Sequence, residues 1–220
     1  AELSDNEPCF DIDSTGRMGI AFTTYSLNLP VFSTMTGSYA QPSLGGADVG
    51  FTIFDQNGQK MMHTYLGGAS NDVPEDMICN RKNEWIITGT TYSTNVTFPE
   101  TNNIGAGLYF PTKSGSYDAY LAKLSSAGSL DYCTYYGGST QTTGYGLTVD
   151  SHDNLYLVGS TKSNIFTLDP MDGSFIDNSY NGLYDGFLLE LDSNYNPKWA
   201  TVIGGSGDDP FPLSKLLYRE

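Results

Sequence analysis

Positive charge is scarce in this chain of 220 residues, because Lys and Arg number 10 against 25 Asp and Glu. The net charge of -15 repels phosphate backbones and anionic lipid surfaces. Nucleic acid is therefore not an expected partner, whereas divalent cations are tolerated. Long apolar runs are missing too, since no stretch approaches the roughly 20 residues of a membrane-spanning helix. We expect no membrane insertion.

Cysteine is also rare. Cys9, Cys79 and Cys133 are an odd set without CxxC or zinc-type spacing, so they cannot all pair within one chain. We expect small buried residues. The alternative is one disulfide with a free thiol.

Glycine and tyrosine, in contrast, are abundant and recur in a short sequence motif. The segment "TYLGGASND" returns as "TYYGGSTQT" and again as "TVIGGSGDD". The glycine pairs begin at Gly67, Gly137 and Gly204, which gives a spacing of 70 and then 67 residues. This spacing predicts a tandem repeat. The predicted units are 1–67, 68–137 and 138–204, with the start of a fourth at 205–220.

Each unit contains two predicted β-hairpins. One opens at a recurrent aspartate, Asp48, Asp118 or Asp185, and continues as in "DAYLAKLSSAGSLDYCTYYGG". The other reads "GLTVDSHDNLYLVGST" or similar. Four short strands per unit is the layout of a propeller blade, and strands with apolar residues on both faces suit stacked blades. We therefore predict an all-β fold, a partial β-propeller with about three four-stranded antiparallel blades.

The recurrent residues have predicted structural roles. Each glycine pair ends a strand where the chain turns sharply or a neighbour approaches, since glycine permits positive φ and close contact. The recurrent aspartates are expected to cap strand amides. His63 occupies the position of Cys133 and Ala200 in the other units, so we expect it to be packed rather than catalytic.

The run "FPTKSGSYDAYLAKLSSAGSLDYCTYYGGS", followed by "GYGLTVDSHDNLYLVGSTKS", closely resembles the bacterial β-propeller repeat family SBBP. Two further copies extend the resemblance over nearly the whole chain. They depart from the pattern at Phe22, which replaces a glycine, and at Gly50, which replaces a strand aromatic. The resemblance implies a secreted or cell-surface bacterial protein, often large and commonly exported by type IX secretion. It implies no catalytic residues.

The expected function is a non-enzymatic binding or scaffold module for a glycan or protein at the cell surface or beyond. We expect a fragment of a larger secreted protein, its remaining blades supplied by a longer chain or another subunit. Long polar and aromatic loops suit binding, and Phe175, Tyr180 and Tyr184 are the predicted ligand contacts. The alternatives are a propeller enzyme that cleaves polysaccharide with carboxylates at the central channel, and a subunit of a secretion or adhesion assembly.

Two local motifs suggest additional chemistry. Asp11 and Asp13 in "DIDSTG", and Asp150 and Asp153 in "DSHDN", present oxygens that suit calcium, although ordinary hairpin turns explain them as well. No other cofactor is expected. Ser14, in "DST", matches an Asp-Ser/Thr O-glycosylation motif of gliding-type bacteria.

Overall fold

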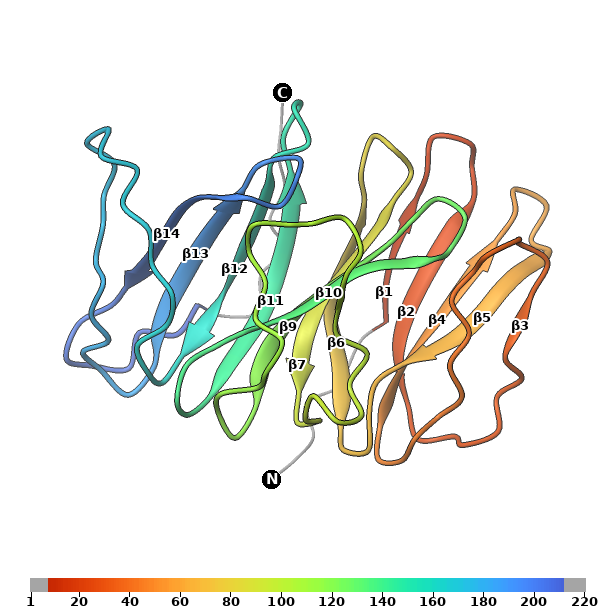
Figure 1. Cartoon of the computed structure of the whole chain (residues 1–220), viewed down its shortest axis with the longest axis horizontal. Coiled ribbons are helices and arrows are strands. Elements are labelled where there is room, and N and C mark those ends of the chain that lie inside the picture. Colours follow the sequence, from red (N-terminus) through yellow and green to blue (C-terminus); the bar gives the residue numbers. More distant parts are fainter. Residues whose placement is uncertain (1–7, 212–220) are drawn as a thin grey trace.

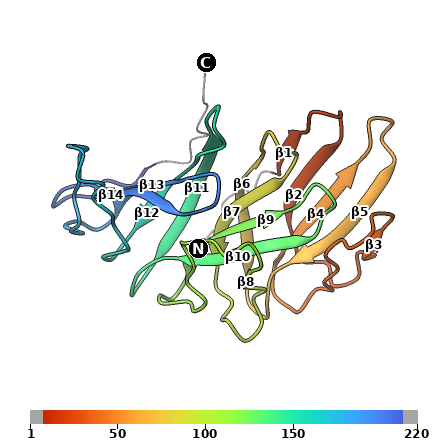
Figure 2. The ribbon, with the colours of Figure 1, turned by 45° about the horizontal axis from the view of Figure 1, so that its top comes forward.

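The computed structural model describes residues 8–211, and over that range the chain forms strands and loops without a helix (Figure 1). The strands build three antiparallel sheets in chain order, which we call blades 1, 2 and 3. Figures 1 and 2 both show blade 2 between the other two. The predicted all-β fold with three propeller blades is therefore confirmed.

The strand order within each blade follows the predicted pair of hairpins. Blade 1 contains β1 (Cys9–Ile12), β2 (Met18–Thr24), β4 (Asp48–Phe54), β5 (Lys60–Leu66) and β3 (Phe32–Ser33). Blade 2 contains β6 (Asp72–Cys79), β7 (Trp85–Thr91), β9 (Asp118–Leu124), β10 (Leu130–Tyr136) and β8 (Thr101–Asn102). Blade 3 contains β11 (Thr142–Val149), β12 (Leu155–Thr161), β13 (Asp185–Leu191) and β14 (Pro197–Ile203). Blades 1 and 2 thus have five strands instead of the predicted four, because their long connections pair briefly with β5 and β10.

The hairpins form because each turn has an Asp, Asn or Ser side chain that accepts backbone N–H groups and a residue that adopts a left-handed conformation. In the first hairpin of blade 1, Asp13 Oδ1 accepts the N–H groups of Thr15 and Arg17, both at 2.9 Å. Gly16 adopts a φ of 85° in this turn. Asp153 takes the same left-handed conformation at the same place in blade 3, with a φ of 60°. Asx-type turns with one left-handed residue connect antiparallel strands in this way.

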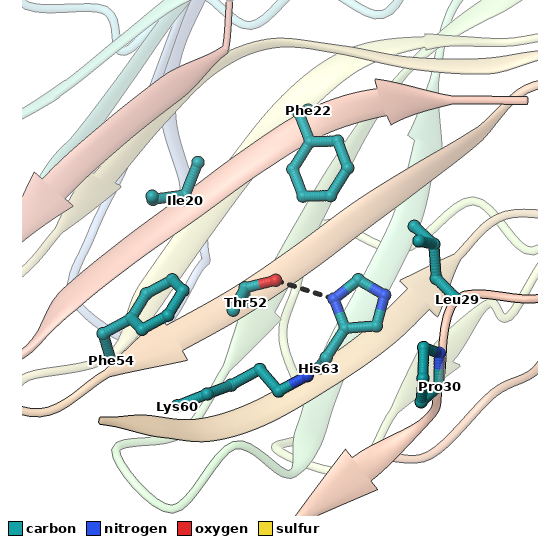
Figure 3. A pocket seen from close by; sticks show the side chains of 8 residues that line it. All are labelled: Ile20, Phe22, Leu29, Pro30, Thr52, Phe54, Lys60 and His63. Atoms are coloured by element: carbon teal, nitrogen blue, oxygen red, sulfur yellow. Dashed lines mark hydrogen bonds between the residues drawn. The ribbon is translucent and has the colours of Figure 1, made fainter. Parts of the chain in front are cut away.

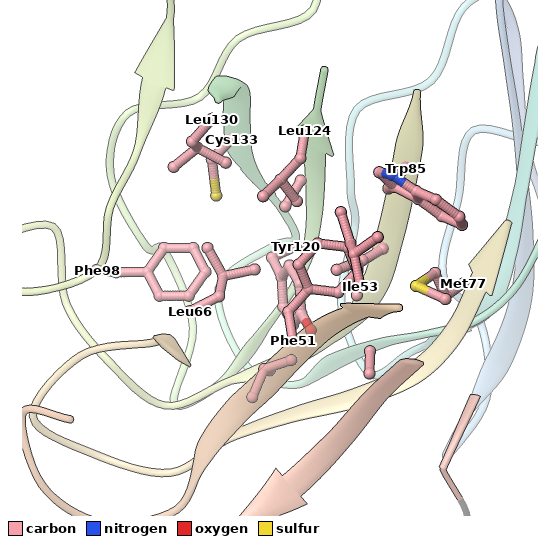
Figure 4. Packing of buried hydrophobic residues seen from close by; sticks show 14 of the residues in the cluster. Phe51, Ile53, Leu66, Met77, Trp85, Phe98, Tyr120, Leu124, Leu130 and Cys133 are labelled. Atoms are coloured by element: carbon pink, nitrogen blue, oxygen red, sulfur yellow. The ribbon is translucent and has the colours of Figure 1, made fainter. Parts of the chain in front are cut away.

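The apolar core lies mainly between neighbouring blades. One cluster joins blade 1 to blade 2 and includes Phe51, Ile53, Trp85 and Tyr120 (Figure 4). A second joins blade 2 to blade 3. Every residue of β9 is consequently buried, which confirms the expectation that central strands are apolar on both faces.

Phe22 and Gly50 depart from the repeat pattern together, and the structure explains why. They are paired across β2 and β4, and a Cβ on Gly50 would lie 2.6 Å from the Phe22 ring. In blade 3 the roles are reversed, since a Cβ on Gly159 would lie 2.5 Å from the Phe187 ring of its partner strand. Each of these blades therefore places one aromatic ring over one glycine. In blade 1 the ring is on the second strand and the glycine on the third, whereas in blade 3 the glycine is on the second main strand and the ring on the third.

Close contact, not positive φ, explains the glycine pairs, since none of their residues has a positive φ. The first glycine of each pair packs against the recurrent aspartate of the same blade. The partners are Gly67 with Asp48, Gly137 with Asp118, and Gly204 with Asp185. Asp118 in turn accepts the N–H groups of Ser114 and Gly115, at 2.7 and 3.0 Å. The capping donors therefore belong to the loop before the strand, whereas strand amides were predicted.

None of the three cysteines forms a disulfide within residues 8–211, so the disulfide alternative is wrong, and the expectation of a small buried residue is confirmed for Cys133. Cys133 is fully buried, while Cys9 and Cys79 are half-buried against the core between blades 1 and 2. Burial raises the pKa of the Cys79 thiol to about 12, and that of Cys133 well above its ordinary value. All three thiols are packing residues of one junction.

Candidate functional site

Tyrosines gather at one end of blades 2 and 3, where the second strand of a blade ends and the third begins. Tyr92 and Tyr117 flank these positions in blade 2, with ring centroids 4.9 Å apart. Lys162 and Tyr184 occupy them in blade 3, with the Lys162 Nζ 4.0 Å from the Tyr184 ring centroid. We call Tyr92, Tyr117, Tyr145 and Tyr184 the tyrosine rim.

Hydrogen bonds connect the tyrosine rim across the two blades. The Tyr184 hydroxyl donates to Gln141 Oε1 at 3.0 Å, and the Thr142 N–H donates to the Tyr117 carbonyl at 3.1 Å. Burial, followed by a hydrogen bond with Tyr184, raises the pKa of Tyr117 above its ordinary value. The Tyr117 hydroxyl therefore stays protonated at neutral pH and can donate a hydrogen bond.

A surface groove of about 400 Å³ adjoins the rim. Its lining residues are Ser116, Ser139, Thr140, Gln141, Lys162, Tyr180 and Leu183. The Tyr180 N–H donates to Asn164 Oδ1 and its hydroxyl donates to the Leu183 carbonyl, both at 2.8 Å. Thr140 Oγ1 donates to the Lys162 carbonyl, also at 2.8 Å. The groove is thus fixed by local hydrogen bonds.

The groove combines an aromatic ring, an amide, an ammonium group and hydroxyls. Such a set can hold a ligand that is apolar on one face and polar at its edges. The lining of the groove contains no histidine or cysteine.

The structure brings two of the three predicted ligand contacts to this groove. Tyr180 lines it, and Tyr184 lies beside it through Gln141 and Lys162. Phe175 lies elsewhere: it is 61% exposed, and its carbonyl accepts the indole N–H of Trp199 on β14 at 2.8 Å. Lys162 and Gln141 were not predicted, because only the fold brings their two loops together.

Three of the predicted calcium ligands occupy hairpin turns, and Asp11 lies on strand β1. Asp13 also accepts the Arg17 Nε–H at 2.6 Å, while Asp150 accepts the N–H groups of His152 and Asn154. These bonds lower the pKa of both carboxyls, against the opposing effect of burial. Within residues 8–211 no group of three or more His, Cys, Asp or Glu side chains is arranged to hold a metal ion.

The other two predicted calcium ligands, Asp11 and Asp153, form hydrogen bonds between neighbouring blades. Asp11 Oδ2 accepts the N–H of Cys79 from β6 at 2.7 Å, and Asp153 Oδ1 accepts the N–H of Arg81 at 3.3 Å. Ser14 is exposed at the tip of the first hairpin, where its hydroxyl donates to Asn83 Oδ1 at 2.9 Å. Its modification stays a prediction.

Glu75 is a half-buried acid that the sequence pattern does not reveal. It sits at a β-bulge of β6, and burial raises its pKa to about 7. Its charge also raises the pKa of Tyr145, which occupies the equivalent bulge of β11, although burial contributes more. β6 also carries two buried aspartates: Asp72 accepts the Thr91 hydroxyl, and Asp76 accepts the N–H of Leu147 from blade 3.

Glu75→Gln is expected to stabilise the protein at neutral and alkaline pH. The folded pKa of Glu75 lies above its unfolded value, so its stabilising contribution is complete below about pH 4.5 and is lost as pH rises through about 7. Glutamine keeps the shape without the charge and should add about 2 kcal/mol at pH 8 but little at pH 4. Urea denaturation at both pH values measures this, with the exposed Asp208→Asn as control; equal effects at both pH values would contradict it.

Three stacked antiparallel sheets with a repeated pair of hairpins define a partial β-propeller. Residues 131–167 match the family model of the SBBP β-propeller repeat. The matched segment runs from β10 of blade 2 through β11 and β12 of blade 3. No curated protein matches the chain. Within the described range, no helix of the length and apolarity needed to cross a bilayer was found.

Proposed function

We propose that this propeller module binds a glycan in the groove beside the tyrosine rim and carries out no catalysis. The observation that supports it is that Gln141, from the β10–β11 loop, and Lys162 and Tyr180, from the β12–β13 connection, meet around one fixed groove. Sugars present C–H faces that pack on aromatic rings, and hydroxyls that exchange hydrogen bonds with amides and hydroxyls. The Lys162 ammonium adds affinity for sugars that carry a carboxylate.

The same proposal places the module outside the cell, at the cell surface or in the secreted fraction. The support is the resemblance to SBBP repeats over nearly the whole chain, together with the family match at residues 131–167. In this setting the module belongs to a large bacterial protein exported by the type IX route, and it serves adhesion.

Tyr180→Ala is expected to weaken glycan binding about tenfold, since one aromatic contact contributes on the order of 1 kcal/mol. Binding is first screened on an array of neutral and acidic oligosaccharides and then measured by calorimetry with the best of them. Tyr180→Phe keeps the ring and should retain most of the affinity. Phe175→Ala, which removes an exposed ring outside the groove, should leave affinity unchanged.

Two results would overturn this assignment. One is the absence of binding to every oligosaccharide on the array; the other is an equal loss of affinity for Phe175→Ala and Tyr180→Ala. A third outcome is that the module binds no glycan but binds a protein, and that Tyr180→Ala abolishes this binding. The groove would then be assigned to a protein partner instead.

A further inference from the structure

Glu75 lies on the middle one of three neighbouring first strands. Between blades, β6 of blade 2 contacts both β1 of blade 1 and β11 of blade 3. The sheets of a propeller surround a central channel, and the first strands lie where the sheets come closest together. Glu75 is half-buried, whereas Pro74 and Asp76 on either side of it are buried. The Glu75 side chain is therefore accessible from the side of the channel.

No positive group among residues 8–211 compensates the Glu75 carboxylate. Burial is the only cause of its raised pKa, so neither a hydrogen bond nor a nearby cation opposes that shift. Both neighbouring first strands belong to the described part of the chain, and their sequences, CFDI in β1 and TTGYGLTV in β11, contain no Lys, Arg or His. The carboxylate therefore has a place for a positive group that neither neighbouring strand fills.

The repeat does not require an acid at this position. At the repeat spacing, the equivalents of Glu75 are Pro8 in blade 1 and Tyr145 in blade 3. The charge also opposes folding at alkaline pH, which is why Glu75→Gln is expected to stabilise the protein there. A residue that lowers stability and is not needed by the repeat is typical of a binding site.

Tyr145 of blade 3 lies beside Glu75 across the junction of the two blades. Each of these residues is the unpaired residue of a β-bulge on its strand. Asp76, which follows Glu75, accepts the N–H of Leu147, two residues beyond Tyr145, at 2.8 Å. Burial, followed by the charge of Glu75, raises the pKa of Tyr145. The carboxylate and the phenol ring are therefore close neighbours, and a hydrogen bond between the blades fixes them.

Tyr145 connects Glu75 to the rest of the tyrosine rim. Burial raises the pKa of Tyr145 most, followed by Glu75 and then by Tyr184. For Tyr117 burial again comes first, and all three other rim tyrosines contribute after it. Groups that affect one another's ionisation in this way lie close together. The tyrosine rim and Glu75 therefore form one continuous cluster across the junction of blades 2 and 3.

The rings of the rim can hold a positive charge. The Lys162 Nζ lies 4.0 Å from the Tyr184 ring centroid, so one ring face of the rim already contacts an ammonium group. Cations are attracted to aromatic faces by the quadrupole of the ring. Within the described range, no Lys or Arg lies in this way over Tyr92, Tyr117 or Tyr145. The net charge of -15 adds a general attraction for cations.

We propose that Glu75 and the tyrosine rim bind the ammonium group of a small primary amine. The N–H groups of such a ligand would donate hydrogen bonds to the Glu75 carboxylate, while its charge and alkyl chain contact the ring faces. A primary amine is favoured over a quaternary one, because a quaternary nitrogen has no N–H group to donate to the carboxylate. The site is separate from the groove, whose lining includes neither Glu75 nor Tyr145. The inference therefore does not depend on glycan binding.

A hollow on blade 1 provides a contrast and a control (Figure 3). It has a volume of about 390 Å³, and its lining includes the rings of Phe22 and Phe54. Its lining contains no acid, and the charged residue there is Lys60. Aromatic rings beside a positive group do not attract an ammonium ion, because like charges repel.

Calorimetric titration of the full 220-residue chain with butylamine tests this proposal. At pH 8 Glu75 is mainly ionised, and butylamine is protonated as a lysine side chain is. We expect saturable binding of one butylamine per chain, with a Kd on the order of 1 mM. Glu75→Gln keeps the shape of the side chain and should raise the Kd about tenfold or more. Tyr145→Leu should raise it about fivefold, whereas Tyr145→Phe keeps the ring and should leave it unchanged.

Two matched variants should leave the Kd for butylamine unchanged. Asp208→Asn removes one exposed carboxylate and so measures the general effect of net charge. Phe54→Leu removes a ring of the blade 1 hollow. Tetramethylammonium, a quaternary ion without N–H groups, should bind the wild-type chain about tenfold more weakly than butylamine.

The proposal would be overturned by the absence of saturable butylamine binding to the wild-type chain. The same holds if Glu75→Gln binds butylamine as tightly as the wild-type chain, or if Asp208→Asn weakens binding as much as Glu75→Gln. Equal affinity for tetramethylammonium and butylamine would overturn the role of the Glu75 carboxylate as a hydrogen-bond acceptor.

Discussion

Gly137→Ala is expected to lower the free energy of unfolding by about 3 kcal/mol, near the upper end for overpacking. An added Cβ would lie 2.6 Å from both Cγ and Oδ1 of Asp118, whose carboxylate is buried. The carboxylate cannot move away freely, because it accepts the N–H groups of Ser114 and Gly115. Steric overlap and loss of a loop cap therefore occur together. Chemical denaturation monitored by tryptophan fluorescence measures the effect.

Gly205→Ala is the matched control for this substitution. Gly205 belongs to the third glycine pair, has no positive φ, and would place its Cβ 3.6 Å from the nearest atom of Asp209. Its cost should stay below about 0.5 kcal/mol, as for most surface changes. If both alanines were tolerated equally, the recurrent glycine would not be required by its contact with the aspartate.

Trp85→Ala is expected to destabilise the protein by about 4 kcal/mol, in the range of aromatic truncations in a core. The Trp85 ring is fully buried between blades 1 and 2 (Figure 4). It packs over Gly19, where a Cβ would lie 2.6 Å from the ring. Its removal leaves a cavity at the junction, because two sheets cannot collapse onto one small void.

A double-mutant cycle identifies this contact as the cause. Gly19→Ala alone should cost about 2 kcal/mol through overlap with the ring, but little or nothing in the Trp85→Ala background, where the methyl group enters vacated space. Additive costs would show that the ring and the glycine do not interact across the junction.

Much of the fold could be predicted from the sequence because its determinants are local. Asp48, Asp118 and Asp185 each begin the third main strand of a blade, as the pattern predicts. Turn chemistry and alternation act over a few residues, so they are readable without the fold. The two-residue strands β3 and β8 were missed because their pairing depends on where the long connections run.

The candidate site was only partly predictable for the same reason. Tyr180 was singled out as an aromatic on a long loop, but Lys162, at the far end of the same loop, and Gln141, on the β10–β11 loop, join it only in the folded chain. The sequence around Glu75 gives no sign of its environment, and only the bulge and the adjoining blade make this acid half-buried. Chemistry that arises where blades meet has no local signature.

The family match illustrates how sequence unit and blade differ. Residues 131–167 begin in β10 of blade 2 and extend beyond β12 of blade 3, so the matched repeat bridges two sheets. The glycine pair at Gly137 and the hydrogen bonds of Thr142 lie inside it. The matched segment therefore contains the passage from one blade to the next, where the Asp118–Gly137 contact fixes the geometry.

The stacking of blades also determines how cooperative the molecule is. In an array whose units contact only their neighbours, folding free energy is approximately the sum of terms for each unit and each junction. The three described blades share two junctions, so within residues 8–211 blade 2 contacts a blade on each face, and blades 1 and 3 contact one blade each. Two junction terms therefore support blade 2, and we expect it to be the last of the three to open in hydrogen exchange.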